Sequence, residues 1–325
     1  MDEFEVIKKF FLPLAAKESS INLDDDAAIL SIKNKSIIIS TDSITEDDHF
    51  QKNEKDPKVI AQKLLRVNLS DIASMGADPF GYTLNLSVPN KLKKTQLISW
   101  IKNFSKGLKI DQQKYNIKLL GGDTVSTKGN LIMSLTAFGV ARNNILKRSG
   151  AKVGDDIYVT GNIGDSGIGY GILEKKIKLN NKKFSQFYIK KHKIPDPPVD
   201  FGKKIGIYAS SCTDISDGFL ADLNNLISSS KCGAEIIINT IPFTKQTKEL
   251  INKKIVTIEY VLSSGEDYQL FFTAKKKFSN SIKKLAYQSS TKISKIGRII
   301  KKRDLLVLNS KRQKLSFKVL GFKHF

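Results

Sequence analysis

Strand-like and helix-like segments alternate in the N-terminal half of the chain, and this alternation constrains the fold more than any other feature of the sequence. A β-branched run at 36–40 is followed by apolar residues with a period near 3.6 from Val59 to Met75. An alternating, strand-like segment at Tyr82–Val88 comes next, and a second helix is predicted from about Lys94 to Tyr115. Strands interleaved with helices are typical of α/β domains with mixed sheets.

The length and texture of the chain predict two domains. At roughly 100–200 residues per domain, 325 residues suffice for two cores. The polar, turn-rich stretch Arg142–Gly154 is the candidate boundary, so we expect an N-terminal domain at 1–145 and a C-terminal α/β domain at 146–325. The second domain opens with a predicted strand at Asp156–Thr160.

The net charge of +22 raises the question of a nucleic-acid partner. The 54 basic residues, however, comprise 48 Lys and only 6 Arg, and the lysines are scattered without interleaved aromatic residues. Proteins that recognise phosphates and bases specifically depend on the bidentate hydrogen bonds of the Arg guanidinium group, which Lys cannot form. We therefore interpret the charge as a solvated Lys-rich surface and expect no nucleic-acid partner.

Several classes of protein are disfavoured by composition. No apolar run approaches the ~20 residues of a membrane span, so we expect no membrane partner and a cytoplasmic protein. The two cysteines, Cys212 and Cys232, are too few for a disulfide framework or a zinc cluster. Three histidines cannot build a His-rich metal site, and no nucleophilic triad follows from the spacing.

Aspartates instead gather in short segments beside hydroxyl residues and glycines. They occur at Asp24–Asp26, Asp42–Asp48, Asp71, Asp123 and Asp214–Asp217. Carboxylate and hydroxyl oxygens are hard ligands that suit Mg²⁺. Three adjacent carboxylates at 24–26 repel one another, which favours a bound cation if the loop is tethered to a core, although an exposed acidic loop would tolerate them.

Asp71 is the most informative of these residues. On a helix it shares a face with Leu64 and Val67, because seven residues make almost two turns. A buried carboxylate needs a partner, so Asp71 is expected to meet either a metal or a structural Lys or Arg.

Three further segments combine glycines with acids. Gly121-Gly122-Asp123-Thr124 is predicted to be a turn between two strands, suited either to a phosphate and its metal or to a plain hairpin. Asp214–Gly218 opens an amphipathic helix with more acid than capping requires, and Ser263–Tyr268 is predicted to be a hairpin. The glycine-rich stretch Gly161–Gly171 fits neither common nucleotide-binding pattern and is a weak phosphate signal.

Taken in order, these segments resemble the thiamine-monophosphate kinase family. The matching motifs are DDAAIL (25–30), STDS (40–43), His49-Phe50, NLSDIASMGADP (68–79), LLGGDT (119–124), KRSGAKVGD (147–155), TGNIGDSGIG (160–169), DISDG (214–218), SGEDYQL (264–270) and the terminal GFKHF. They span nearly the whole chain. Each motif is weak by itself, but the ordered set is specific.

The resemblance implies a fold shared with aminoimidazole ribonucleotide synthetase, in which two α/β domains form each chain. It also implies a homodimer whose N-terminal domains pair into a β-barrel. The activity implied is ATP-dependent phosphorylation of thiamine monophosphate to thiamine diphosphate, with several Mg²⁺ ions and direct in-line transfer.

The resemblance also assigns residues. Those similar to Mg²⁺ ligands are Asp26, Ser40, Thr41, Asp42, Asp71, Asp123, Asp214 and Asp217. Those similar to ATP contacts are Tyr115, Gly122, Asp123, Arg148 and Ser216, and those similar to thiamine-phosphate contacts are His49, Glu266 and Phe322. Asp42, Asp71, Asp123 and Arg148 are the residues expected to take part most directly in transfer.

The chain departs from the family pattern at Asp24, which replaces the glycine that usually begins the first acidic motif and adds a carboxylate there. Other members of the superfamily remain alternatives, above all an enzyme similar to aminoimidazole ribonucleotide synthetase. Selenophosphate synthetases match less well, because they use a reactive cysteine or selenocysteine near the N-terminus and the first cysteine here is Cys212. Hydrogenase-maturation dehydratases match less well, because they use a C-terminal cysteine and this sequence ends in His324-Phe325.

Overall fold

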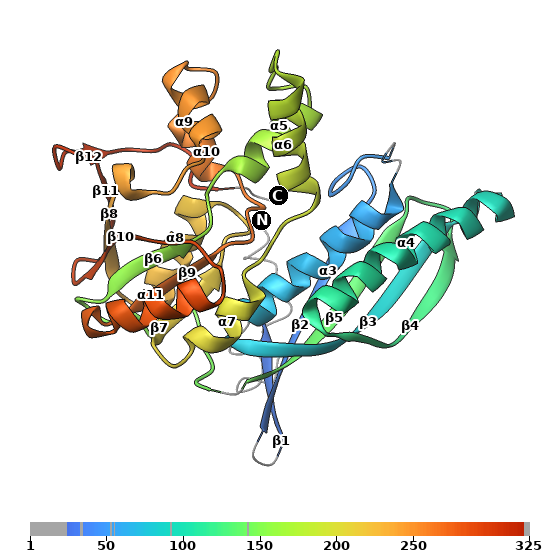
Figure 1. The fold of residues 1–325 in the computed structure, drawn as a ribbon, viewed down its shortest axis with the longest axis horizontal. Coiled ribbons are helices and arrows are strands. Elements are labelled where there is room, and N and C mark those ends of the chain that lie inside the picture. The colour runs from blue at the N-terminus through green and yellow to red at the C-terminus, as the bar shows by residue number, and fades with distance from the viewer. Residues whose placement is uncertain are drawn as a thin grey trace.

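Two mixed β-sheets, one in each half of the chain, frame the molecule, and one long helix lies between them (Figure 1). The computed structural model describes residues 25–32, 35–52, 54, 56–91, 93–141 and 143–321. The prediction of a mixed α/β fold is confirmed.

The first half forms a five-stranded sheet in the order β1-β2-β5-β3-β4. Its strands are β1 (Ala28–Ile32), β2 (Lys35–Thr45), β3 (Ala77–Pro89), β4 (Lys118–Thr127) and β5 (Ile132–Ala141). The helices are α3 (Pro57–Ser74) and α4 (Lys94–Tyr115), both within two residues of their predicted bounds. Only β3 and β4 pair in parallel; the other neighbours are antiparallel.

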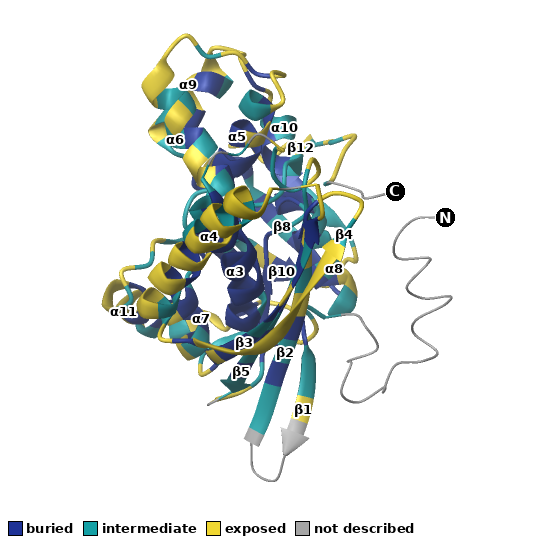
Figure 2. Cartoon of the chain, turned by 90° about the vertical axis from the view of Figure 1, so that its right-hand side faces the viewer, coloured by how far each residue is buried: buried dark blue, intermediate teal, exposed yellow. Residues whose placement is uncertain are grey.

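Helix α3 is buried along nearly its whole length because both halves of the molecule pack against it (Figures 1 and 2). It begins with Pro57 at the first turn, where a missing N–H costs nothing, and the Asp56 side chain caps the N–H of Lys58. Leu64, Leu69 and Ile72 are fully buried in the core beside the first sheet.

The second half forms a seven-stranded sheet in the order β12-β11-β8-β10-β6-β9-β7, in which only β8 and β11 are parallel. Its strands are β6 (Asp156–Thr160), β7 (Ala209–Asp214), β8 (Gly233–Ile237), β9 (Leu270–Ala274), β10 (Ile293–Ile300), β11 (Leu305–Leu308) and β12 (Lys314–Leu315). The helices are α5 (Asp165–Leu173), α6 (Lys182–Lys193), α7 (Val199–Ile205), α8 (Phe219–Ser229), α9 (Lys245–Asn252), α10 (Ile258–Ser263) and α11 (Ser279–Gln288).

Two predicted turns are wrong. The residues 121–123 lie inside β4, because this strand pairs in parallel with β3 and runs on to Thr127 instead of turning back. Gly122 passes so close to β3, at φ +153°, that a Cβ atom would lie 1.9 Å from the Leu84 carbonyl oxygen. In place of the hairpin predicted at 263–268, Ser263 ends α10 and residues 264–269 form a loop that leads to β9.

The β4 strand is exposed along almost its whole length, at the edge of the first sheet (Figure 2). Its apolar side chains remain in contact with solvent: Leu119 is 48% exposed, Leu120 56% and Val125 49%. Within the described residues, β4 pairs only with β3 and β1 only with β2, so the sheet of this chain is open and not a closed barrel.

In the part of the chain that the structure describes, the long helices are too polar to cross a membrane.

Candidate functional site

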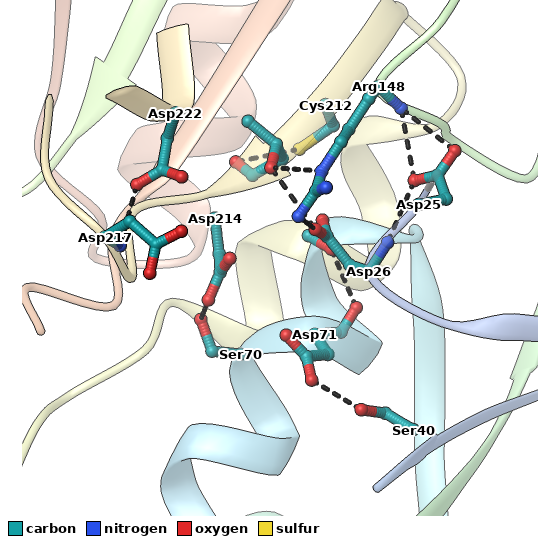
Figure 3. A network of polar contacts seen from close by, with 12 residues as sticks. Asp25, Asp26, Ser40, Ser70, Asp71, Arg148, Cys212, Asp214, Asp217 and Asp222 are labelled. Carbon is teal, nitrogen blue, oxygen red and sulfur yellow. Dashed lines mark hydrogen bonds and ion pairs between the residues drawn. The ribbon is translucent and has the colours of Figure 1, made fainter. Parts of the chain in front are cut away.

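Four aspartates from distant parts of the sequence meet beside α3, and we call them the aspartate cluster: Asp26, Asp42, Asp71 and Asp214. Asp26 precedes β1, Asp42 lies in β2, Asp71 is in the last turns of α3, and Asp214 ends β7. Figure 3 shows three of them around the C-terminal end of α3. The cluster therefore joins the two halves of the molecule.

Each hydroxyl that touches the cluster donates to a carboxylate. Ser40 Oγ donates to Asp71 Oδ2. From α3, Ser70 Oγ donates to Asp214 Oδ2 at 2.6 Å, and Ser74 Oγ donates to Asp26 Oδ2 at 2.7 Å (Figure 3).

Arg148 is the cation of this site. Its guanidinium group forms an ion pair with Asp26, and its Nε donates to Thr213 Oγ1 at 3.3 Å. Its main-chain N–H also donates to both carboxylate oxygens of Asp25, at 3.2 Å each. Among the described residues, no Lys or Arg pairs with Asp71, so the structural ion pair that the sequence left open for this residue is not formed.

The carboxylates carry more negative charge than their surroundings balance. Burial, opposed by a hydrogen bond from Asp71 and reinforced by Asp26, raises the pKa of Asp42 to about 6. Burial and Asp26 raise the pKa of Asp214 to about 8. Burial and the charge of Asp42 raise the pKa of Asp71 well above its usual value. A group of buried acids with raised pKa values is typical of a site that receives cations.

The donor set fits Mg²⁺ held together with a substrate. Carboxylate and hydroxyl oxygens are its preferred ligands, and Mg²⁺ is commonly bound by one or two carboxylates, waters and substrate phosphates. Among the described residues, no three acidic, His or Cys side chains converge on a point where one ion would bind. The cluster therefore suits metal binding shared with substrate phosphates better than an ion held by protein ligands alone.

The segment Asp214–Gly218 borders the cluster and precedes α8, as predicted. Asp222 of α8 folds back to accept from the main-chain N–H groups of Asp217 and Gly218, at 3.0 Å each (Figure 3). The Ser216 carbonyl oxygen accepts from the N–H of Glu266 at 2.7 Å. The structure thus brings Ser216, Asp217 and Glu266 into one region.

The two described residues predicted to contact thiamine phosphate are joined by a buried lysine. Lys63 Nζ donates to the His49 carbonyl oxygen at 2.9 Å and lies 3.0 Å from each carboxylate oxygen of Glu266. His192 Nδ1 lies 2.8 Å from Glu266 Oε2. His49 and Glu266 come from different halves of the chain, so the tertiary fold alone makes them neighbours.

Gly122 and Asp123 are not brought to the cluster of their own chain. The register places Asp42, Leu135, Leu84 and Gly122 in one row across β2, β5, β3 and β4. Three strand spacings separate the ends of that row by about 14 Å along the sheet. The Asp123 N–H donates to the Asn85 side chain, which is exposed on the face away from α3.

Two other predicted residues also lie apart from the cluster. The Thr41 side chain is exposed, and its hydroxyl lies 2.9 Å from that of Thr136, on the opposite face of the sheet from Asp42. Tyr115 lines a separate cavity of about 280 Å³ between the two halves, to which no residue of the aspartate cluster contributes.

Phe322 and Asp24 lie outside the described residues. Gly321, next to Phe322, lies against Asp217: a Cβ atom on Gly321 would be 2.8 Å from the Asp217 carbonyl oxygen.

The glycine-rich stretch 161–171 forms the start of α5, where the Asp267 carboxylate accepts from the N–H groups of Gly164 and Ser166.

The sequence reasoning missed a polar stripe on α3. Lys63, Ser70 and Ser74 are spaced by seven and four residues, so they lie on one helix face. In the structure this face contacts Glu266, Asp214 and Asp26, in that order along the helix. The spacing of these three polar residues along one face of the predicted helix was the available signal.

Comparison with known proteins defines the class. Residues 24–141 match the family model described as AIR synthase related protein, N-terminal domain, and residues 152–307 match the corresponding C-terminal domain. The fold and the site thus belong to a two-domain AIR synthase related protein.

The similar proteins narrow this class further. A thiamine-monophosphate kinase of Buchnera aphidicola subsp. Schizaphis graminum is 42% identical over 332 residues, which cover 100% of this chain and 99% of that protein. The thiamine-monophosphate kinase of Escherichia coli K12 is 38% identical, covering 83% of this chain and 82% of its own. A structure described as AaThiL complexed with AMPPCP and TMP superposes with a TM-score of 0.86 at 29% identity, covering 100% of this chain and 97% of that one. The chain belongs to the thiamine-monophosphate kinase family.

Proposed function

We propose that this protein transfers the γ-phosphate of ATP to thiamine monophosphate and so forms thiamine diphosphate. The observation that carries the proposal is the buried aspartate cluster with Arg148 paired to Asp26, in a chain that aligns end to end with a thiamine-monophosphate kinase. The relative bound to AMPPCP and TMP supports both substrates, since AMPPCP is an ATP analogue.

The chemistry requires charge compensation more than proton transfer. The acceptor oxygen of a phosphate monoester is already anionic at neutral pH, so no general base is needed. It attacks the γ-phosphorus in line, and ADP leaves with the bond electrons. Arg148 is proposed to stabilise charge on the transferred group, and Ser216 and Gly122 are proposed to contact ATP.

The proposed Mg²⁺ ligands are the residues carried over from the family. They are Asp26, Ser40, Thr41, Asp42, Asp71, Asp123, Asp214 and Asp217. When bound, the ions would neutralise the phosphates of both substrates, which otherwise repel. Of this set, Asp26, Asp42, Asp71 and Asp214 form the cluster and Ser40 donates to it, whereas Thr41 could reach it only through its main chain.

Thiamine monophosphate is proposed to bind on the side of His49, Glu266 and Phe322. The Glu266 side chain is 26% exposed, and its carboxylate would offer negative charge to a cationic thiazolium ring. Tyr115 stays a prediction as an ATP contact, since it lines the separate cavity.

A homodimer is proposed because β4 is a long, exposed and partly apolar edge. Such an edge is an aggregation hazard unless another chain covers it. Pairing of two open N-terminal sheets into a barrel would bury Leu119, Leu120 and Val125. It would also carry Asp123 of one chain toward the cluster of its partner.

We further propose a domain boundary between residues 145 and 146, within the interval 142–151 that neither family model covers. We also propose a cytoplasmic location.

An ADP-release assay tests the activity. With Mg²⁺ and ATP, we expect ADP only when thiamine monophosphate is added, and not with thiamine or with formylglycinamidine ribonucleotide. Turnover with formylglycinamidine ribonucleotide instead would assign the chain to the reaction of aminoimidazole ribonucleotide synthetase.

A further inference from the structure

Lys63 and His192 form a buried pair around Glu266 that the transfer reaction itself does not use. Lys63 is 2% exposed and His192 6% exposed, so the cost of burying them must be offset by what they hold. Lys63 Nζ lies 3.0 Å from both Glu266 oxygens, and His192 Nδ1 lies 2.8 Å from Glu266 Oε2. Lys63 Nζ also lies 3.5 Å from His192 Nε2.

This pair ties together three segments. Lys63 belongs to α3, His192 to α6, and Glu266 to the loop before β9. The same Lys63 Nζ donates to the carbonyl oxygen of His49, in the loop after β2. One ammonium group therefore spans the only two described residues that we assign to the thiamine-phosphate side.

Glu266 is held in a conformation that it would not keep by itself. Its φ is +66°, in the left-handed region that favours glycine. Its N–H donates to the Ser216 carbonyl oxygen, and its carboxylate is bound on the buried side by Lys63 and His192. The Glu266 side chain as a whole is 26% exposed, so these contacts hold a carboxylate that is partly open to solvent on its remaining side.

We propose that Lys63 and His192 are positioning residues for thiamine monophosphate, which fix the Glu266 carboxylate and the His49 main chain at the acceptor side of the site. This inference rests on the proposed function, which assigns His49 and Glu266 to that substrate. It assigns no chemical step to either residue. Loss of the pair should weaken binding of thiamine monophosphate while leaving binding of ATP intact.

The decisive experiment compares KM for each substrate in Lys63→Met, Glu266→Gln and the double variant Lys63→Met/Glu266→Gln. For Lys63→Met we expect KM for thiamine monophosphate to rise about 10–100-fold, with KM for ATP and kcat within about threefold of the wild type. Because Lys63 acts mainly through Glu266, the double variant should have nearly the same KM for thiamine monophosphate as Glu266→Gln alone. Any further rise in KM would measure what Lys63 contributes through its hydrogen bond to the His49 carbonyl oxygen.

Two control measurements separate a loss of stability from a loss of substrate binding. Lys63→Met leaves a largely buried carboxylate without its cation and is expected to lower Tm, whereas the double variant removes that charge and should regain much of the loss. Lys203→Met breaks a different ion pair between the two halves, Lys203–Asp78 at 3.5 Å, and should leave both KM values unchanged.

His192 provides the conservative comparison. His192→Gln keeps a hydrogen-bond donor and should raise KM for thiamine monophosphate less than His192→Phe does. Equal rises in KM for ATP and thiamine monophosphate, or additive effects of Lys63→Met and Glu266→Gln, would overturn the positioning role. A wild-type protein without turnover of thiamine monophosphate would instead overturn the proposed function, so the two failures are distinguishable.

Discussion

The aspartate cluster and the β4 edge both carry residues predicted for one magnesium site, yet their surroundings are opposite. The cluster is buried and assembled within one chain from Asp26, Asp42, Asp71 and Asp214. Asp123 lies on an exposed edge strand, about 14 Å along the sheet from β2. The four buried aspartates thus lie together in one chain, whereas Asp123 would reach them only from a second copy, as in the proposed homodimer.

The difference also has an energetic side. Inside the cluster, like charges raise one another's pKa, so removing a carboxylate relieves repulsion at the cost of ligands. On β4, the Asp123 side chain accepts from the main-chain N–H of Thr124, and the contact with Asn85 is made by the Asp123 main chain, so substitution of Asp123 should change stability little.

The largest expected effect is that of Asp71→Asn. Activity should fall by about 10³-fold, because electrostatic stabilisation at the site of transfer is lost. The unliganded protein should fold and melt at an equal or higher temperature, since a buried charge has been removed. Steady-state kinetics and thermal melts test this prediction, and near-wild-type turnover would rule out the metal-ligand role of Asp71.

Mixing two inactive variants tests whether the site spans two chains. Asp71→Asn and Asp123→Asn should each be inactive as homodimers. In a random mixture, half of the dimers are mixed and one of their two sites is intact, so about a quarter of wild-type activity should return.

The control for this complementation is a mixture of Asp71→Asn with Asp214→Asn. If Asp71 and Asp214 act in one chain's cluster, as the Ser70–Asp214 contact indicates, this mixture should regain nothing. Absence of recovery in the Asp71→Asn and Asp123→Asn mixture would place Asp123 outside a shared site.

The smallest effect concerns stability and pH. The folded-state pKa values of Asp25, Asp42 and Asp214 are raised to about 7, 6 and 8 from 3.8, so the folded protein holds more protons than the unfolded chain between about pH 4 and 8. The free energy of unfolding should therefore fall as pH rises through that window. His192, whose pKa is lowered by burial, opposes this trend, and so does Glu266 near pH 4, because Lys63 holds the pKa of its carboxyl well below the usual value.

Melting in EDTA should show a Tm about 5 °C lower at pH 8 than at pH 6. Added Mg²⁺ should raise Tm more at pH 8 than at pH 6, because it binds the ionised carboxylates. Asp267, with a pKa raised to about 8 outside the cluster, contributes the same pH trend without the Mg²⁺ dependence. A Tm that rises with pH in EDTA would contradict the assignment of these charges.

The local sequence predicted helices better than it predicted strand ends. Helix α4 was predicted at its observed bounds, because a period of 3.6 continues over 22 residues. The strand β2 continues five residues beyond the β-branched run at 36–40, since pairing with β5 extends to Thr45. Strand length depends on a partner that is distant in sequence, so local pattern does not determine it.

The distribution of charge in the folded protein indicates its function better than the net charge does. A surplus of 22 positive charges suggested polyanions in general. Only the buried acids and Arg148 distinguish a phosphate-transfer site from a basic surface, because a charge removed from water interacts far more strongly than an exposed one.

The sequence by itself determined the fold class, the oxygen-rich chemistry and the family, because these depend on residue type and order. The tertiary structure alone decided which residues meet: it joined Asp71 to Asp214, joined His49 to Glu266 through Lys63, and separated Asp123 from Asp42. The physical reason is that charges and hydrogen bonds act over a few ångströms, and sequence spacing does not fix a distance once strands from different parts of the chain pair.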